Sequence, residues 1–301
     1  MRWETAIQDF LQYLKIERGM ATHTLQSYRM DLLALERFLA NYKIEESPIN
    51  CSAETLQAFI YESAKELKPS SQSRRLSGLK SFFDFLIFEN YRKTHPTLLI
   101  ESPKQGRYLP TVLSVEEIDR MIAQIDLEHP QGYRNHAIIE MLYGCGLRVS
   151  ELVDLKLSQL FFTEKLVRIQ GKGNKQRLVP LGRVCRETLH IYFENSRSQQ
   201  KINPAFSDTV FLNRNGKQLT RAMIFTVVKT LAERAEIGKN VSPHTFRHSF
   251  ATHLLENGAD LPSVQMLLGH ESITTTEVYT HLSTQHLQQV MLNHHPHGKI
   301  S

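Results

Sequence analysis

Four short motifs in the sequence carry side chains that suit phosphoryl transfer. They span residues 144–152, 171–173, 244–253 and 268–279. Together they supply two arginines, a lysine, two histidines and a tyrosine, namely Arg148, Lys172, His244, Arg247, His270 and Tyr279. Two planar guanidinium groups can each bind two non-bridging oxygens of a phosphodiester. They would stabilise the charge that develops in a pentacoordinate transition state, a role that a metal often has elsewhere.

The remaining groups could supply the nucleophile and move the protons. A tyrosine hydroxyl is a suitable nucleophile, because a phosphotyrosine ester keeps the bond energy and the step can be reversed. Lys172 lies in a predicted turn that could reach into DNA, so its ammonium could protonate the departing oxygen. A histidine could donate to the phosphate or carry the proton of the nucleophile. The six residues therefore predict phosphoryl transfer without a metal.

Each of these residues alone also has a simpler structural explanation. Arg148 could pair with Glu151 on the next helical turn, and Lys172 could be an exposed turn lysine. The histidine and arginine of the third motif could stand at the start of a helix. Tyr279 could fill the core. Only the combination of all six groups favours the chemistry.

The histidines and cysteines give little support for a metal centre. His244 and His248 lie four residues apart on a predicted helix, but no His-Glu-x-x-His motif, cysteine pair or third carboxylate accompanies them. We expect no metal and no cofactor. The three cysteines are odd in number and far apart, which predicts reduced thiols in a cytoplasmic protein. The histidine-rich residues 294–297 are expected to fray.

The first part of the chain must be a small helical bundle. Apolar residues recur at helical spacing over residues 3–18, 22–41, 52–65 and 70–89. Prolines and glycines without periodicity follow at 91–110, which predicts a linker. We therefore expect a helical domain at 1–90 and a second domain at 111–301.

The second domain is predicted to be mainly helical with a small antiparallel β-sheet. Ser114 and Glu117 have the spacing of a capping box, and residues 132–144 are apolar enough for a buried helix. Residues 166–170 and 177–181 alternate like strands around a turn at 171–176, which predicts a β-hairpin. A third short strand is expected at 210–212. Further helices are expected at 183–195, 220–236, 244–257, 262–268, 271–281 and 283–294.

Composition and charge exclude several classes of protein. Of the 301 residues, 41% are hydrophobic and 22% are charged, which indicates a globular chain and excludes a disordered one. No apolar run approaches about 18 residues, so no membrane-spanning helix is expected, and the first residues begin an amphipathic pattern and no signal peptide. The net charge is +5. Two stretches, 67–83 and 165–186, contain no acidic residue, so they could face nucleic acid or be simply solvated.

The combination of motifs resembles the tyrosine recombinases, also called the integrase family, and within them the Xer-type recombinases of bacteria. The resemblance extends over essentially the whole chain. Its most specific parts are the run His-Thr-Phe-Arg-His-Ser-Phe-Ala-Thr-His at 244–253 and the Leu-Gly-His box that ends at His270. Tyr279 follows nine residues later. Residues 73–83 resemble the family's helix that lies on DNA.

The resemblance implies a role for each residue of the catalytic set. Tyr279 would attack the scissile phosphate and become linked to the DNA 3′ phosphate, which releases a 5′ hydroxyl. Arg148 and Arg247 would bind that phosphate. Lys172 would be the general acid, and His244 would assist proton transfer.

Further roles follow from the same resemblance. His270 would hydrogen-bond a phosphate oxygen, and Glu151 would orient the turn that carries the first arginine. The two domains would close around a DNA duplex as a clamp. Direct DNA contacts are expected from basic residues of the two acid-free stretches, namely Arg74, Arg75, Lys80, Lys175 and Arg177.

The resemblance also implies partners. The protein would act as a homo- or heterotetramer, with copies of itself or with a second recombinase, on two double-stranded DNA sites. A DNA translocase is a candidate regulator. Leu287, Val290 and Met291 form a narrow apolar stripe on the final helix over 283–295. The resemblance implies that this helix docks on a neighbouring protomer, the alternative being that it packs on its own domain.

The expected function is site-specific recombination in chromosome dimer resolution. The alternative within the same chemistry is an integrase or invertase of a mobile element, since its catalytic residues would be the same. A type IB topoisomerase-like enzyme, a DNA-binding protein without catalysis and a metal-dependent nuclease are further alternatives. The complete catalytic set argues against the non-catalytic binder, because a binder has no need of a nucleophile.

Overall fold

The computed structural model describes residues 1–98, 100–103, 111–171, 176–269 and 284–298. The chain divides into two compact units, Met1–Tyr108 and Leu109–Ser301. We call the first the N-terminal unit and the second the catalytic unit, because all six predicted catalytic residues belong to it. Four residues of the predicted site lie outside the described residues: Lys172, Lys175, His270 and Tyr279. Among the described helices, none is long and apolar enough to cross a membrane.

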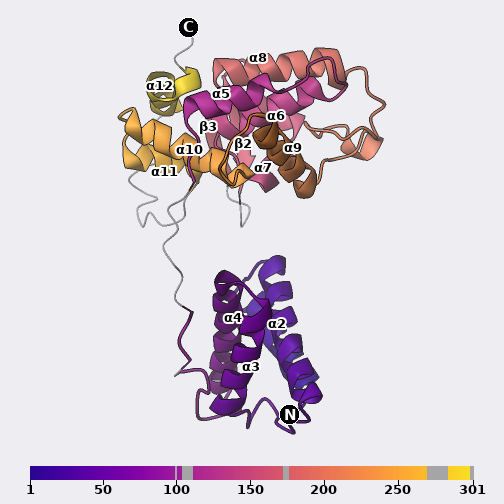
Figure 1. Ribbon diagram of the computed structural model, residues 1–301, viewed down its shortest axis with the longest axis vertical. Coiled ribbons are helices and arrows are strands. Elements are labelled where there is room, and N and C mark those ends of the chain that lie inside the picture. Colours follow the sequence, from indigo (N-terminus) through magenta and orange to yellow (C-terminus); the bar gives the residue numbers. More distant parts are fainter. Residues whose placement is uncertain (99, 104–110, 172–175, 270–283, 299–301) are drawn as a thin grey trace. The chain divides into compact units, whose positions relative to one another are not determined.

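The N-terminal unit is the predicted four-helix bundle (Figure 1). Its helices are α1 (Trp3–Ile16), α2 (Thr22–Asn41), α3 (Ala53–Glu66) and α4 (Pro69–Phe88). The apolar faces seen in the sequence meet in one core, in which Phe10 and Phe82 contact edge to face with ring centroids 5.3 Å apart. Such aromatic pairs add to the stabilisation that burial provides. This packed core therefore holds α4 in a fixed position within the bundle.

The catalytic unit is mainly helical, as predicted. Ser114 begins its first helix with the predicted capping box. The α-helices are α5 (Val115–Ala123), α6 (Gly132–Gly144), α7 (Val149–Val153), α8 (Arg183–Tyr192), α9 (Arg221–Arg234), α10 (Pro243–Glu256), α11 (Leu261–Leu268) and α12 (Thr284–His294). Short 3-10 turns at Leu157–Gln159, Pro204–Phe206 and Pro296–Gly298 and a π-helical turn at Phe193–Arg197 are the other helical elements of the described part of this unit. The helix predicted at 271–281 lies outside the described residues.

Helix α6 lies at the centre of this unit and packs against α8 and α10 (Figure 1). Its buried residues cover its whole circumference, from Ala137 and Ile138 to Met141 and Leu142, all with no exposed surface. A helix that is apolar on every side is stable only inside a core. The chain leaves α6 directly into the motif at 144–152, so a helix buried in the core positions that motif.

The small sheet contains the predicted hairpin and a different third strand. Strands β1 (Leu160–Phe161), β2 (Leu166–Gln170) and β3 (Gln176–Pro180) are antiparallel in the order β1-β2-β3, and Gln170 pairs with Gln176 at the end of the hairpin. The third strand predicted at 210–212 is wrong. Val210 donates to the carbonyl of Leu155, and the pairing of Leu212 with Gln218 is an isolated bridge and not part of a strand. Side chains of two helices bind the other backbone groups: the hydroxyl of Tyr192 of α8 donates to the carbonyl of Val210 and accepts from the backbone N of Leu212, and Arg134 of α6 donates to the carbonyl of Leu212.

The last helix packs on its own domain. Leu287, Val290 and Met291 are each about 95% buried in the core of the catalytic unit, and α12 contacts β3, α10 and α11. In the single chain the stripe packs on apolar surface of its own unit, as in the alternative that we considered, and docking on a neighbouring protomer stays a prediction. The frayed end predicted for 294–297 is also wrong, since His295 is buried.

Candidate active site

The first motif forms a sharp turn between α6 and α7 that places Arg148. Gly146 has a φ of 57°, in the left-handed region, and a Cβ there would lie 2.6 Å from Cδ1 of Phe250. Only glycine fits this backbone without displacing the aromatic ring. After this turn, Arg148 is the residue just before α7, and 37% of its side chain is exposed.

The carboxylate of Glu151 is shared by three arginines. It accepts hydrogen bonds from the backbone N and the Nη1 of Arg148, both at 2.8 Å. It also accepts from Nη1 and Nη2 of Arg177 at 2.8 and 2.9 Å, and Nη1 of Arg247 lies 3.9 Å away. Burial raises the pKa of Glu151, but the hydrogen bonds and charge of Arg177, followed by those of Arg148, outweigh it and hold the pKa below its ordinary value. Glu151 is therefore ionised, and it orients the turn of Arg148 as expected.

Arg247 lies in the second turn of α10 and is only 8% exposed. Its Nη1 donates to the carbonyl of Gly146 at 2.6 Å, and its Nη2 donates to the carbonyl of Leu268. Burial and the positive charge of Arg148 lower the pKa of this guanidinium to about 10, although Glu151 opposes the shift. Three arginines around one carboxylate leave positive charge in excess. This arrangement suits an anionic ligand.

His244 is exposed and lies one turn before Arg247 on the same helix. Burial of part of its ring, together with the charges of Arg247, His248 and Arg148, lowers its pKa below the ordinary value. The ring is consequently neutral at pH 7 and can accept a proton. Proximity to the two arginines brings His244 into the same site as the predicted phosphate-binding pair.

The described neighbours of two further predicted site residues, Lys172 and His270, lie at the same arginine cluster. Lys172 lies in the segment that joins β2 to β3, which ends where Gln170 pairs with Gln176. His270 follows Gly269, which ends α11 in the left-handed conformation with a φ of 65°. The carbonyls of Leu267 and Leu268 at this end of α11 bind Arg177 and Arg247. The structure thus brings the flanks of both segments to the arginine cluster.

Arg177, predicted to bind DNA, is engaged within the protein. Its side chain is 11% exposed, and its guanidinium contacts Glu151 and the carbonyl of Leu267. Its predicted DNA contact stays untested, and the structure gives it a different partner. Sequence reasoning missed this pairing because Arg177 and Glu151 are 26 residues apart and share no local pattern.

Arg74 and Arg75 on α4 also have a partner inside the protein. Both pair with Asp31 of α2, whose side chain is 1% exposed, and Arg75 donates in addition to the hydroxyl of Ser63. Arg74 keeps 45% of its side chain exposed, and Lys80 is half-buried. The DNA contacts of these residues stay a prediction. The structure adds that the two arginines neutralise a buried carboxylate, which no sequence signal indicated.

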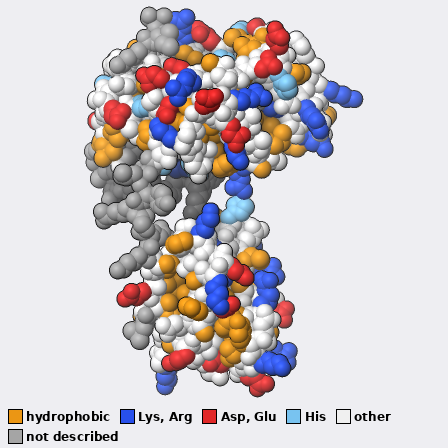
Figure 2. Space-filling view, viewed as in Figure 1, with side chains coloured by type: hydrophobic (Ala, Val, Ile, Leu, Met, Phe, Trp, Pro, Cys, Tyr) orange, Lys and Arg blue, Asp and Glu red, His pale blue; other side chains and the backbone are white. Residues whose placement is uncertain are grey.

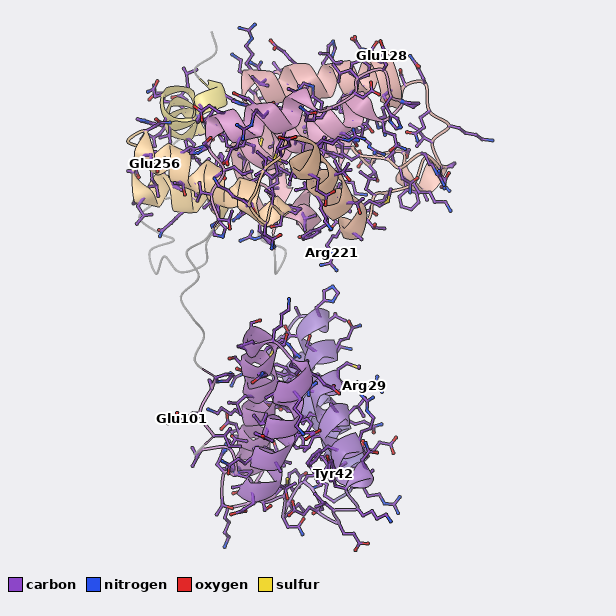
Figure 3. All side chains as sticks on the ribbon, viewed as in Figure 1. Arg29, Tyr42, Glu101, Glu128, Arg221 and Glu256 are labelled. Atoms are coloured by element: carbon purple, nitrogen blue, oxygen red, sulfur yellow. The ribbon has the colours of Figure 1, made fainter. Side chains whose placement is uncertain are left out.

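Other basic side chains are distributed over both units. On the visible face of the catalytic unit, Lys and Arg are interspersed with Asp and Glu, a pattern typical of solvated surface (Figure 2). Arg221 projects from the start of α9, and Arg29 projects outward from α2 (Figure 3). Within the described ranges, no group of three or more His, Cys, Asp or Glu side chains could hold a metal ion. The arginine cluster around Glu151 is thus the strongest candidate site.

Comparison with protein families gives a match to both units. Residues 111–286 match the phage integrase family, and residues 7–90 match the phage integrase, N-terminal SAM-like domain. The tyrosine recombinase XerD of Lacticaseibacillus casei is 43% identical over 292 residues, which cover 97% of this chain and 99% of that protein. The tyrosine recombinase XerD of Oceanobacillus iheyensis is 40% identical over 294 residues, which cover 97% of this chain and 99% of that protein.

Solved structures share the fold. The XerH site-specific recombinase bound to palindromic difH substrate, in a post-cleavage complex, superposes with a TM-score of 0.71 at 24% identity, and the match covers 94% of this chain and 83% of that chain. A lambda integrase (75–356) dimer bound to a COC′ core site also gives a TM-score of 0.71, at 18% identity, and covers 91% of this chain and 97% of that chain. The folds of the N-terminal unit and the catalytic unit thus occur together in these solved structures as well.

Proposed function

This chain belongs to the phage integrase family and is a site-specific tyrosine recombinase, and we propose that it breaks and rejoins double-stranded DNA through a covalent 3′-phosphotyrosine link at Tyr279, without a metal. The observation that carries the proposal is the arrangement of Arg148 and Arg247 around Glu151. The excess positive charge of this arrangement is partly exposed at Arg148. It is complementary to the negative charge of a scissile phosphodiester.

The two arginines bind the phosphate in this reaction. Arg247 is fixed by the carbonyls of Gly146 and Leu268, so its guanidinium needs little reorganisation when the transition state forms. Arg148 is held through its backbone N and Nη1 while part of its side chain faces solvent. Fixed donors of this kind stabilise charge that develops on the non-bridging oxygens.

The remaining residues move protons. The oxygen of Tyr279 attacks phosphorus, the bond from phosphorus to the 5′ oxygen breaks, and the DNA 3′ phosphate stays on the tyrosine. His244, neutral at pH 7, assists removal of the tyrosine proton, and Lys172 delivers a proton to the leaving 5′ oxygen. His270 hydrogen-bonds a phosphate oxygen. Attack by a 5′ hydroxyl reverses these steps and rejoins the strand.

The biological role that we propose is resolution of chromosome dimers in the cytoplasm. The XerD relatives match over nearly the full length of the chain, which favours this role over that of a mobile-element integrase. The protein would act as a tetramer, with its own copies or with a second recombinase, on two DNA sites. A DNA translocase would be its regulator.

The proposal is tested by trapping the covalent complex. The probe is a synthetic duplex that carries the chromosomal recombination site of the host, with a nick beside the scissile phosphate so that the released fragment diffuses away. The wild-type protein should form a protein–DNA adduct in EDTA, and Tyr279→Phe should bind the duplex without forming one. An adduct with the Phe variant would refute the assignment of the nucleophile, and loss of the adduct in EDTA would refute the metal-independent chemistry.

A further inference from the structure

We propose that Arg177 is a positioning residue of the cleavage reaction, which keeps Arg148 available to the phosphate by pairing with Glu151 and connects that pair to the end of α11. This inference rests on the proposed function, since it assumes that Arg148 and Arg247 bind the scissile phosphate. It replaces a DNA contact by Arg177 with a role inside the protein.

The side chain of Arg177 connects three elements, β3, α7 and α11. The residue is the second of β3, directly beyond the segment that contains Lys172. Its Nη1 and Nη2 donate to the two oxygens of Glu151 on α7, and its Nε donates to the carbonyl of Leu267 on α11 at 2.8 Å. A rigid guanidinium can hold a carboxylate with two parallel bonds and still use Nε elsewhere, which the ammonium of a lysine cannot do.

The pairing with Glu151 decides what Arg148 can do. Arg177 satisfies both carboxylate oxygens, whereas Arg148 contributes one side-chain nitrogen, Nη1, to the same carboxylate. A buried carboxylate must keep a counter-ion, because an unpaired charge in the interior is strongly unfavourable. Apart from Arg177, the described cations that lie beside Glu151 are Arg148 and, at 3.9 Å, Arg247. Without Arg177, the carboxylate would draw the phosphate-binding arginines toward itself.

The bond to Leu267 positions a second part of the site. The last carbonyls of a helix have no partner within the helix. At the end of α11, Arg177 binds the carbonyl of Leu267 and Arg247 binds that of Leu268. Gly269 follows in the left-handed conformation, and a Cβ at Gly269 would lie 3.0 Å from Cδ of Arg177. Arg177 thus fixes the course of the chain one residue before His270.

The experiment separates positioning from DNA contact with four variants. Arg177→Met removes the charge, and Glu151→Gln in the Arg177→Met background also removes the carboxylate that would capture Arg148. Arg177→Lys keeps a charge beside Glu151 but cannot also hold Leu267, and it guards against misfolding of the Met variant. Arg197→Met is the matched control, because Arg197 also binds backbone carbonyls, those of Ser207 and Thr209. Two quantities are measured for each: the rate of adduct formation at saturating DNA, and the slope of log affinity against log salt on a single-site duplex.

We expect Arg177→Met to lower the rate at least about 10-fold, as for loss of a group that orients a transition-state donor, with the salt slope unchanged. The double variant should recover several-fold of that loss, Arg177→Lys should lie between wild type and Arg177→Met, and the control should cleave like wild type. A slope reduced by about 0.9, the value for one lost phosphate contact, would overturn the proposal in favour of DNA contact. A folded double variant no faster than Arg177→Met would also overturn it. Absence of any wild-type adduct would contradict the proposed function instead, and the salt slope would still decide the role of Arg177.

Discussion

The Nδ1 of His297 lies 3.0 Å from the carboxylate of Glu140, a residue 157 positions earlier in the buried helix α6. The other ring nitrogen, Nε2, lies 3.3 Å from Asp119 on α5. Burial lowers the pKa of His297, but its hydrogen bonds and charge interactions with Glu140 and Asp119 outweigh burial and raise the pKa above its ordinary value of 6.5. Below this raised pKa, the protonated imidazole bridges two carboxylates and fastens residues 296–298 to α5 and α6 of the catalytic unit.

This contact predicts a pH-dependent loss of stability in His297→Gln. Because the folded-state pKa is raised, the stabilisation is fully present below about 6.5 and is lost as the pH rises through the folded-state pKa. The substitution should lower the free energy of unfolding by about 1.5–3 kcal/mol at about pH 6, the range for hydrogen bonds to charged groups, and by less at about pH 9. Urea unfolding at both pH values measures this.

The control for this prediction is His190→Gln. His190 also pairs with a glutamate, Glu194, but its side chain is 71% exposed. Its replacement should change the free energy of unfolding by no more than about 0.5 kcal/mol at either pH. An equal loss at both pH values in His297→Gln would show that the imidazole stabilises the unit by packing and not by its charge.

The turn before Arg148 gives a second prediction. Gly146→Ala places a Cβ 2.6 Å from the ring of Phe250 and forces a positive φ on alanine. Backbone strain and overpacking should together lower the free energy of unfolding by about 1–3 kcal/mol. Adduct formation should also slow, because the carbonyl of Gly146 holds Arg247. Gly238→Ala is the control, since a Cβ there meets nothing within 4 Å. Equal stability of the two variants in urea would contradict the steric argument.

The basic surface of α4 gives a third prediction, in which two effects separate. Lys80→Ala should weaken binding to any duplex and reduce the slope of log affinity against log salt by about 0.9, with little change in stability. Arg75→Ala should destabilise the N-terminal unit by about 1–3 kcal/mol, because Asp31 loses one of its two cations. Salt titrations and urea unfolding of both variants distinguish these effects. An unchanged slope in Lys80→Ala would mean that Lys80 does not contact a DNA phosphate.

Features with a local periodic signal could be predicted from the sequence, and the structure has them. The helices at 22–41 and 132–144 begin and end at the predicted residues, and the pairing of Arg148 with Glu151 follows from a separation of three residues. The unpredicted features join residues that are distant in the chain. Asp31 and Arg74 are 43 residues apart, and Arg177 and Glu151 are 26 apart. Such pairs depend on how helices and strands pack, which periodicity does not encode.

The buried stripe of α12 gives the last prediction, which distinguishes packing on its own unit from docking on a neighbour. Leu287 is 5% exposed within the core of the catalytic unit, whereas Leu292 on the same helix is 61% exposed. Leu287→Ala should therefore lower the free energy of unfolding of the DNA-free protein by about 2–5 kcal/mol, the cost of a buried cavity. Leu292→Ala should change it by no more than about 0.5 kcal/mol.

Urea unfolding of dilute protein and gel-shift cooperativity on a two-site duplex are the two measurements. If α12 instead occupied a neighbouring protomer, Leu287→Ala would leave the unfolding of the dilute protein unchanged and would lower cooperativity, because the lost contacts would lie between protomers. The structure predicts instead that Leu287→Ala lowers the stability of the single chain in dilute solution. This result follows because the stripe packs against β3 and α10, where each lost methyl group leaves a void in the unit's own core.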